Sequence, residues 1–240
     1  EANVLSLSDD QVHAFRQLLR DRGIGLSAIG SPIGKIPVDQ DFVPHLDKFR
    51  RAIQLCEWFG IDAIRIFSFY PPEKGQKDWS ENRGEVMRRM ESLVSLAEKA
   101  GIRLFHENEH RIYGDSPERV GDLLAQFPGK TLSAAYDAAN FVFCGYCPWE
   151  GWLSSRDRVA HLHIKDWKSG ASHGSLAGEG HGRWLEVLKD ATQRGYSGFA
   201  TLEPHLLGGG PTGGVTGTEL FPKAVDSARR LILEAGGQVH

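Results

Sequence analysis

The sequence predicts an α/β fold of the (β/α)8 TIM-barrel type, as one domain that covers residues 1–240. Short apolar segments rich in β-formers alternate with helical segments along the whole chain, without a long linker or a break in composition. Near-continuous apolar strands in such an alternation are typical of a parallel sheet that helices cover. Many α/β barrels of this length form a single domain.

The helices are predicted from their boundary residues and from apolar residues at helical spacing. Ser8 indicates a helix start and Gly23 the end of that helix. Gly60 and Gly101 end two further helices, and Pro117 suits a first helical turn. The predicted helices cover 8–22, 42–59, 84–100, a segment from 116 onward, 182–194 and 219–235.

Six strands are predicted, at 24–29, 63–70, 103–106, 132–136, 159–164 and 199–202. A short seventh strand is expected around 175–177. The chain opens with a helix, so we expect the first barrel strand to be missing from the N-terminus of this chain. The stretch 206–218 holds six glycines and one proline, which predicts a mobile loop on the active face. It has no basic residue, so a flexible lid or disorder is favoured over a phosphate site.

Composition argues against several classes of protein. The net charge of −3 is unlike that of a dedicated nucleic-acid-binding surface. No apolar run approaches the length of a membrane span. Three cysteines do not make a disulfide framework, which fits a reducing, cytoplasmic location. The pair Cys144 and Cys147 is interpreted as incidental or buried, and Trp58 and Trp79 on outer helices leave room for a homodimer.

Four acidic or histidine residues stand where predicted strands end: Glu107, Asp137, His163 and Glu203. The carboxyl ends of parallel barrel strands converge on one face, and that face carries the chemistry. Two Glu, one Asp and one His suit a single divalent cation such as Mn, Mg, Co or Zn. One such residue alone is more often a helix cap or an ion-pair partner, whereas the four together favour a metal site.

Other residues near these strand ends have ordinary interpretations. Glu109 and His110 are expected to be solvated loop residues. The aromatic residues near 58–70 are expected to be mostly core, although Phe69 or Tyr70 is a candidate wall of a sugar pocket.

The motifs at the strand ends resemble the xylose isomerase-like TIM-barrel superfamily over nearly the whole chain. The superfamily includes tagatose and psicose 3-epimerases, other sugar phosphate isomerases and epimerases, inosose dehydratase, hydroxypyruvate isomerase and endonuclease IV. The motifs that carry the resemblance are His161-Leu-His163-Ile-Lys165-Asp166, the block from Tyr136 to Phe141, Gly178-Glu179-Gly180 followed by Trp184, and Leu202-Glu203-Pro204.

The resemblance implies an isomerase or epimerase of a sugar, keto-sugar or sugar phosphate, with one divalent metal held by Glu107, Asp137, His163 and Glu203. The two glutamates would also be the catalytic acid and base, which remove and return a proton beside a carbonyl while the metal stabilises the enediolate. Expected substrate contacts are His173, Lys165, Asn140 and Glu179. Strand alternation places His161 on the side of His163, one layer deeper in the barrel.

Three alternatives remain at this point. An inosose-type dehydratase begins with the same proton abstraction. An endonuclease IV-like repair enzyme needs three zinc ions, but this chain has Asn140 and Ala171 where that family has a His and an Asp. The third alternative is a non-catalytic sugar-binding barrel, which the complete Glu/Asp/His/Glu set does not favour.

Overall fold

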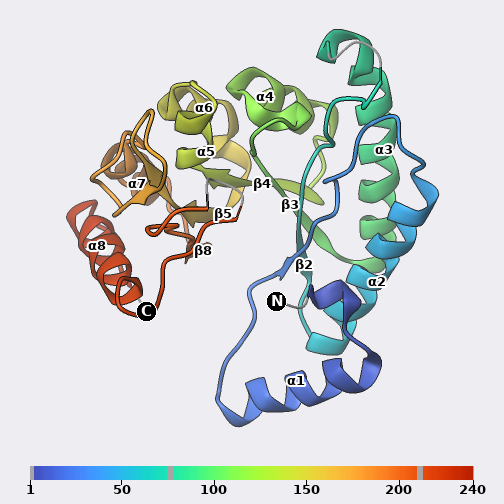
Figure 1. Ribbon diagram of the computed structural model, residues 1–240, viewed down its shortest axis with the longest axis horizontal. Coiled ribbons are helices and arrows are strands. Elements are labelled where there is room, and N and C mark those ends of the chain that lie inside the picture. The colour runs from blue at the N-terminus through green and yellow to red at the C-terminus, as the bar shows by residue number, and fades with distance from the viewer. Residues whose placement is uncertain (1–2, 75–77, 210–212, 240) are drawn as a thin grey trace. The chain divides into compact units, whose positions relative to one another are not determined.

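The computed structural model describes residues 3–74, 78–209 and 213–239. The chain forms two compact units: one runs to His106 and includes Phe127–Ser133, and the other comprises Glu107–Gln126 with Ala134–His240. Figure 1 shows the helices and strands of both units and labels the helices α1–α8 and the longer strands. The predicted loop over 206–218 lies partly outside the described residues.

The first unit alternates helices with short parallel strands. Ile29 lies opposite Ile64, and Ile64 opposite Leu104, so the strands pair in the order β1, β2, β3. The Leu104 N–H donates to the Thr131 carbonyl at 2.7 Å, which joins β3 to the segment that leads into β4. The elements are η1 (Val4–Ser6), α1 (Asp9–Asp21), β1 (Ile29–Gly30), α2 (Val43–Phe59), β2 (Ala63–Ile66), α3 (Trp79–Ala100) and β3 (Arg103–Glu107).

Local sequence explains where these helices begin and end. Ser8 and Gln11 form a reciprocal capping box at the start of α1. Gly60 and Gly101 end α2 and α3 in the left-handed region, at φ 70° and 68°, where glycine has no side chain to clash. The helix predicted over 84–100 starts earlier, because the Asp78 carboxylate accepts the Ser80 N–H and caps the first turn.

The strand predicted over 63–70 ends at Ile66. Phe69 has a left-handed φ of 71°, which a regular strand cannot contain. Its side chain is fully buried, and its ring lies 5.7 Å from that of Phe42 with the Arg89 guanidinium over it. Phe69 is therefore a core residue of the first unit. Trp58 also packs within this unit, with its ring 5.2 Å from that of His13. The homodimer stays a prediction.

The second unit carries the other parallel strands. Asp137 lies opposite His163, and His163 opposite Thr201, so the strands pair in the order β4, β5, β8. The elements are η2 (Tyr113–Asp115), α4 (Pro117–Gln126), β4 (Leu132–Asp137, which begins in the first unit), α5 (Ala138–Phe143), α6 (Pro148–Ser155), η3 (Arg156–Arg158), β5 (Val159–Ile164), β6 (Asp166–Trp167), β7 (Gly174–Ser175), α7 (Trp184–Gln193), β8 (Phe199–Leu202) and α8 (Phe221–Glu234).

The seventh strand expected around 175–177 is not a barrel strand. Gly174 and Ser175 form β7, which pairs antiparallel with β6 in a separate two-stranded sheet. Gly174 also donates its N–H to the His205 carbonyl, and a Cβ there would lie 2.1 Å from the Pro204 carbonyl oxygen. This close contact requires glycine. The α/β fold of the TIM-barrel type is confirmed, with six parallel strands in the described residues.

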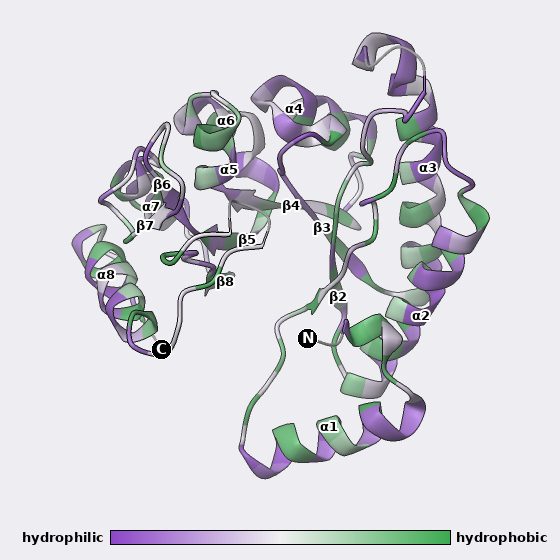
Figure 2. Ribbon diagram, viewed as in Figure 1, coloured by the Kyte–Doolittle hydropathy of each residue, from purple (hydrophilic) through white to green (hydrophobic). Residues whose placement is uncertain are grey.

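The core of the second unit is built on three buried aromatic rings. The Tyr136 ring lies 5.3 Å from that of Trp152 and 5.9 Å from that of Trp184, both edge to face. Each polar group is satisfied: Tyr136 donates to the Pro148 carbonyl, Trp152 to Asp190 and Trp184 to the Lys165 carbonyl. Figure 2 shows hydrophobic and hydrophilic residues together on α8, whose buried residues recur at helical spacing.

Two further findings concern the predictions from composition. No helix among residues 3–74, 78–209 and 213–239 is long and apolar enough to cross a membrane. The three thiols, of Cys56, Cys144 and Cys147, are free, with Cys56 buried in the first unit and the other two half-buried in the second.

Candidate metal centre

Strand register brings the four predicted ligands to one place in the second unit. Asp137 and His163 are direct partners across β4 and β5. Thr201 lies opposite His163, so Glu203, two residues further along, follows it on the same side. Glu107 ends β3 and completes the set. One donor atom from each residue lies within 4.8 Å of all the others.

The cluster is buried except at one carboxylate. The Glu107 and Asp137 side chains are 2% and 0% exposed, that of His163 is 13% exposed, and that of Glu203 is 38% exposed. A molecule that approaches the cluster therefore meets the Glu203 carboxylate first.

The donor atoms of the cluster lie within ion-pair distance of one another. His163 Nδ1 lies 3.2 Å from Glu107 Oε1 and 3.6 Å from Glu203 Oε2. Among the described residues, His163 Nδ1 and Glu203 Oε2 are nevertheless buried atoms outside well-formed hydrogen bonds. Buried polar atoms normally have partners. One nitrogen and three carboxylates that converge in this way fit a shared divalent cation.

The charged side chains of the cluster shift one another's pKa values. Burial raises the pKa of Asp137 to about 6, although Lys165 opposes the rise. Burial disfavours the charged form of His163, but the Glu107 and Glu203 carboxylates outweigh it and raise its pKa to about 9. Burial also disfavours ionisation of Glu203, yet the adjacent His163 and His205 imidazoles and the charge of Lys165 hold its pKa well below the usual range.

Lys165 was predicted to contact substrate, and the structure places its ammonium against the ligands. Its Nζ lies 2.8 Å from Asp137 Oδ2 and 3.7 Å from Glu203 Oε2, and its side chain is 1% exposed. Burial disfavours this charge, but the surrounding carboxylates raise the pKa of Lys165 further above its usual value. The Trp184 indole donates to the Lys165 carbonyl at 2.8 Å and fixes the backbone there.

The neighbouring residue, Asp166, organises the turn that carries Glu179. Its carboxylate accepts the N–H groups of Gly178, Gly180 and Gly182 at 2.8, 3.0 and 2.8 Å. A Cβ at Gly180 would lie 2.2 Å from Asp166 Oδ1, so the turn needs glycine to close on the carboxylate.

The remaining predicted substrate contacts differ in position. His173 lies before this turn and Glu179 lies within it, and both residues are exposed. His173 Nδ1 is 2.8 Å from the Gly174 carbonyl oxygen. Asn140 is buried beside the cluster: its N–H donates to Asp137 Oδ1 at 3.0 Å. His161 is also buried, with its ring 5.1 Å from that of His163 and its Nε2 3.1 Å from Thr201 Oγ1, as expected for a deeper layer.

Three further residues near the cluster were not predicted. His205 is buried, with its Nε2 3.4 Å from Glu203 Oε1, and a left-handed φ of 48° turns it back toward that carboxylate. Asn108 bonds the backbone of Asp137 through its side chain. Glu109 was expected to be solvated but is buried, and its Oε1 accepts the His110 N–H at 2.9 Å.

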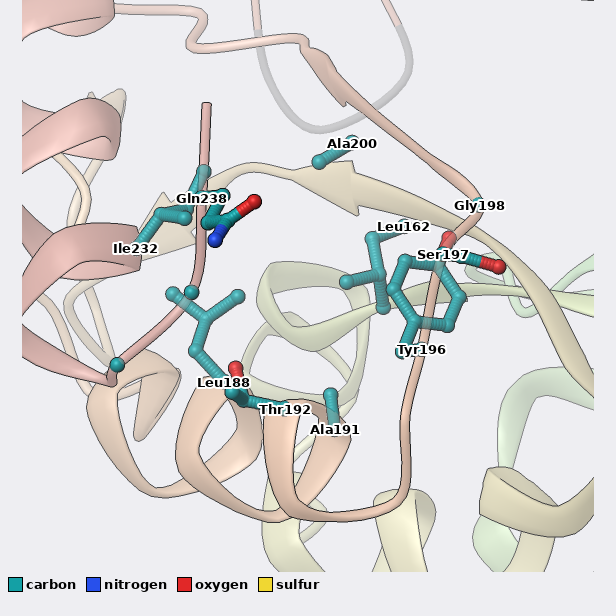
Figure 3. A pocket seen from close by; sticks show the side chains of 12 residues that line it. Leu162, Leu188, Ala191, Thr192, Tyr196, Ser197, Gly198, Ala200, Ile232 and Gln238 are labelled. Atoms are coloured by element: carbon teal, nitrogen blue, oxygen red, sulfur yellow. The ribbon is translucent and has the colours of Figure 1, made fainter. Parts of the chain in front are cut away.

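A separate pocket of about 440 Å³ lies on the other face of β5 and β8, against α7 and α8 (Figure 3). Leu162 and Ala200 line it, and they alternate with the residues that face the cluster. Its lining includes no carboxylate or imidazole, so this pocket is not part of the metal centre.

Parallel strands with a carboxylate–histidine cluster at their carboxyl ends define a barrel-type protein with a candidate metal site. The family model of the xylose isomerase-like TIM barrel matches residues 1–227, and the chain belongs to this family. No curated protein matches the sequence significantly.

Solved structures share the fold at low sequence identity. A D-tagatose 3-epimerase-like protein is 18% identical, with a TM-score of 0.75 over 95% of this chain and 84% of that one. A xylose isomerase-like TIM barrel protein from Mycobacterium smegmatis in complex with magnesium is 19% identical, with a TM-score of 0.74 over 97% and 80%. D-psicose 3-epimerase from Clostridium cellulolyticum H10, solved with D-tagatose, is 15% identical, with a TM-score of 0.71 over 94% and 85%.

Proposed function

We propose that the chain is a divalent-metal-dependent isomerase or epimerase that acts on a sugar, keto-sugar or sugar phosphate. The observation that carries the proposal is the convergence of one donor atom each from Glu107, Asp137, His163 and Glu203 within 4.8 Å. Two of these residues, His163 and Glu203, present a buried Nδ1 and Oε2 outside well-formed hydrogen bonds. A D-tagatose 3-epimerase-like protein and D-psicose 3-epimerase among the structural neighbours support it.

The four cluster residues would hold one divalent ion, of Mn, Co, Mg or Zn. A bound ion would supply Lewis acidity toward a substrate carbonyl, which would make the adjacent C–H more acidic. Glu203 is the more exposed of the two glutamates and would take the proton from carbon. Glu107, which approaches His163 Nδ1 as Glu203 does, would return a proton to the opposite face in an epimerisation.

Other residues would orient these groups and the substrate. His205 would hold Glu203 Oε1, so that Oε2 faces the cluster. Lys165 and Asn140 remain proposed substrate contacts because both reach the cluster, and the unbonded, buried Oδ1 of Asn140 suits a hydroxyl donor. His173 and Glu179, on exposed segments, would contact the outer part of the substrate.

The test is exchange of a substrate C–H with solvent deuterium, followed by NMR across a panel of keto-sugars and their phosphates with Mn²⁺ supplied. Glu203→Gln is expected to slow exchange by about 100-fold or more, because the amide cannot accept the proton. Glu234→Gln, on the exposed face of α8, is the matched control. Unchanged exchange in Glu203→Gln contradicts the assignment.

The same experiment distinguishes the alternatives. A product lighter by one water would identify a dehydratase, which shares the first proton abstraction. A trinuclear nuclease would need more ligands, and among the described residues no second group of three or more His, Cys, Asp or Glu side chains lies close enough to share an ion.

A further inference from the structure

Asn108 lies one residue beyond Glu107, where β3 has ended and the backbone ladder no longer fixes the chain. The side chain of Asn108, rather than its backbone, makes the hydrogen bonds to Asp137. Asn108 Nδ2 donates to the Asp137 carbonyl at 2.8 Å, and Asn108 Oδ1 accepts the Asp137 N–H at 2.9 Å. One planar amide thus satisfies both backbone groups of a cluster residue.

Asn140 closes this arrangement from the other side. Its Nδ2 donates to the Asn108 carbonyl at 2.8 Å, and its N–H donates to Asp137 Oδ1 at 3.0 Å. Four hydrogen bonds therefore link Asn108, Asp137 and Asn140, and all three residues are buried, with exposed fractions of 3%, 0% and 1%. Oδ1 of Asp137 is held by the Asn140 N–H, and the other oxygen, Oδ2, is the one that lies 2.8 Å from Lys165 Nζ.

We infer that Asn108 is a positioning residue of the metal centre. It is covalently adjacent to Glu107 and hydrogen-bonded to the backbone of Asp137, so its side chain sets the spacing between two of the four ligands. This inference rests on the proposed function, because it assigns Asn108 a role toward the ion that the cluster would hold. Partners that orient metal ligands in this way affect affinity without touching the metal.

The chemistry of the contact explains why asparagine is required. Aspartate has the same shape but no donor, so it would place a buried carboxylate oxygen against the Asp137 carbonyl oxygen. Alanine would remove both of these hydrogen bonds from the buried backbone of Asp137. Either change would release the Asp137 backbone from the end of β3 while leaving all four ligands in the chain.

The experiment measures the Mn²⁺ dissociation constant of the purified, EDTA-treated protein, from the EPR signal of free Mn²⁺. We expect Asn108→Ala and Asn108→Asp to weaken binding about 10- to 100-fold. Asn82→Ala is the matched control, because Asn82 Nδ2 also donates to a backbone carbonyl, that of Asp78, but in the first turn of α3. It should bind Mn²⁺ as the wild type does.

A double-mutant cycle separates positioning from a merely structural role. In an Asp137→Ala background, Asn108→Ala should weaken Mn²⁺ binding much less than it does in the wild type, because the ligand that Asn108 orients is gone. Circular dichroism establishes folding of each variant, and Asn108→Asp, which keeps the size of the side chain, serves if Asn108→Ala does not fold.

Two results are distinguishable failures. If both Asn108 variants fold and bind Mn²⁺ within about twofold of the wild type, or if the two changes are additive in the cycle, the inference about Asn108 is wrong while the metal centre stands. If the wild type itself binds no Mn²⁺, Co²⁺, Mg²⁺ or Zn²⁺, the proposed function fails first.

Discussion

Replacement of Lys165 by Met removes the ammonium that lies among the carboxylates of the cluster. The Lys165 ammonium is 2.8 Å from Asp137 Oδ2 and 3.7 Å from Glu203 Oε2. At an effective dielectric constant of about 20, these separations correspond to attractions of about 6 and about 4 kcal/mol. Desolvation of the ammonium offsets much of this, and loss of one partner from a buried ion pair costs about 3–5 kcal/mol.

The metal-free protein should therefore lose about 3–5 kcal/mol of unfolding free energy in the Lys165→Met variant. A divalent ion bound by the cluster supplies positive charge at the same carboxylates, so the loss should be smaller in saturating Mn²⁺. The assay is urea denaturation in EDTA and in Mn²⁺, followed by tryptophan fluorescence. Lys189→Met, on the exposed face of α7, is the control. An equal loss in EDTA and in Mn²⁺ would refute this account of the charge balance.

Three further predictions concern the scaffold. Burial lowers the pKa of His45 to about 4. The unfolded chain therefore binds a proton before the folded one does, and about 3 kcal/mol of folding stability should be lost as the pH falls from 6.5 to 4. Urea titrations of the wild type and of His45→Gln across this pH range measure the loss, and a stability difference that does not change with pH argues against it. Gly34→Ala should cost more than 2 kcal/mol, since φ is 91° and the new Cβ would lie 2.1 Å from the Phe67 carbonyl oxygen; an unchanged melting temperature contradicts this. Asp166→Ala should loosen the turn at Gly180, which faster amide hydrogen exchange there would reveal and native protection would disprove.

The cluster of four candidate ligands could be predicted because it depends on topology and on residues at strand ends. Glu107 is the last residue of β3, and Asp137 and His163 lie opposite each other near the carboxyl ends of β4 and β5. Parallel strands place their carboxyl ends together. Helix ends at Gly60 and Gly101 were equally visible, because a left-handed residue after a helix favours glycine.

Features that depend on conformation after the strands end were not visible in the sequence. The left-handed backbone at Phe69 ends the predicted strand early and places an aromatic residue in the core. His205 reaches Glu203 because its own φ is positive. The spacing of apolar residues in the sequence does not predict a left-handed residue at this position. Asn108 and Glu109 follow a strand as loop residues do, and only tertiary packing buries them.

The most direct test of the metal centre is elemental analysis of the purified protein beside an Asp137→Ala variant. The wild type should hold about one equivalent of a divalent metal after purification, and the more weakly binding variant should hold far less, because Asp137 is the fully buried candidate ligand at the centre of the hydrogen-bonded arrangement. Close to three zinc ions per chain, or no metal after Mn²⁺, Co²⁺, Mg²⁺ or Zn²⁺ is supplied, would contradict a single four-ligand centre.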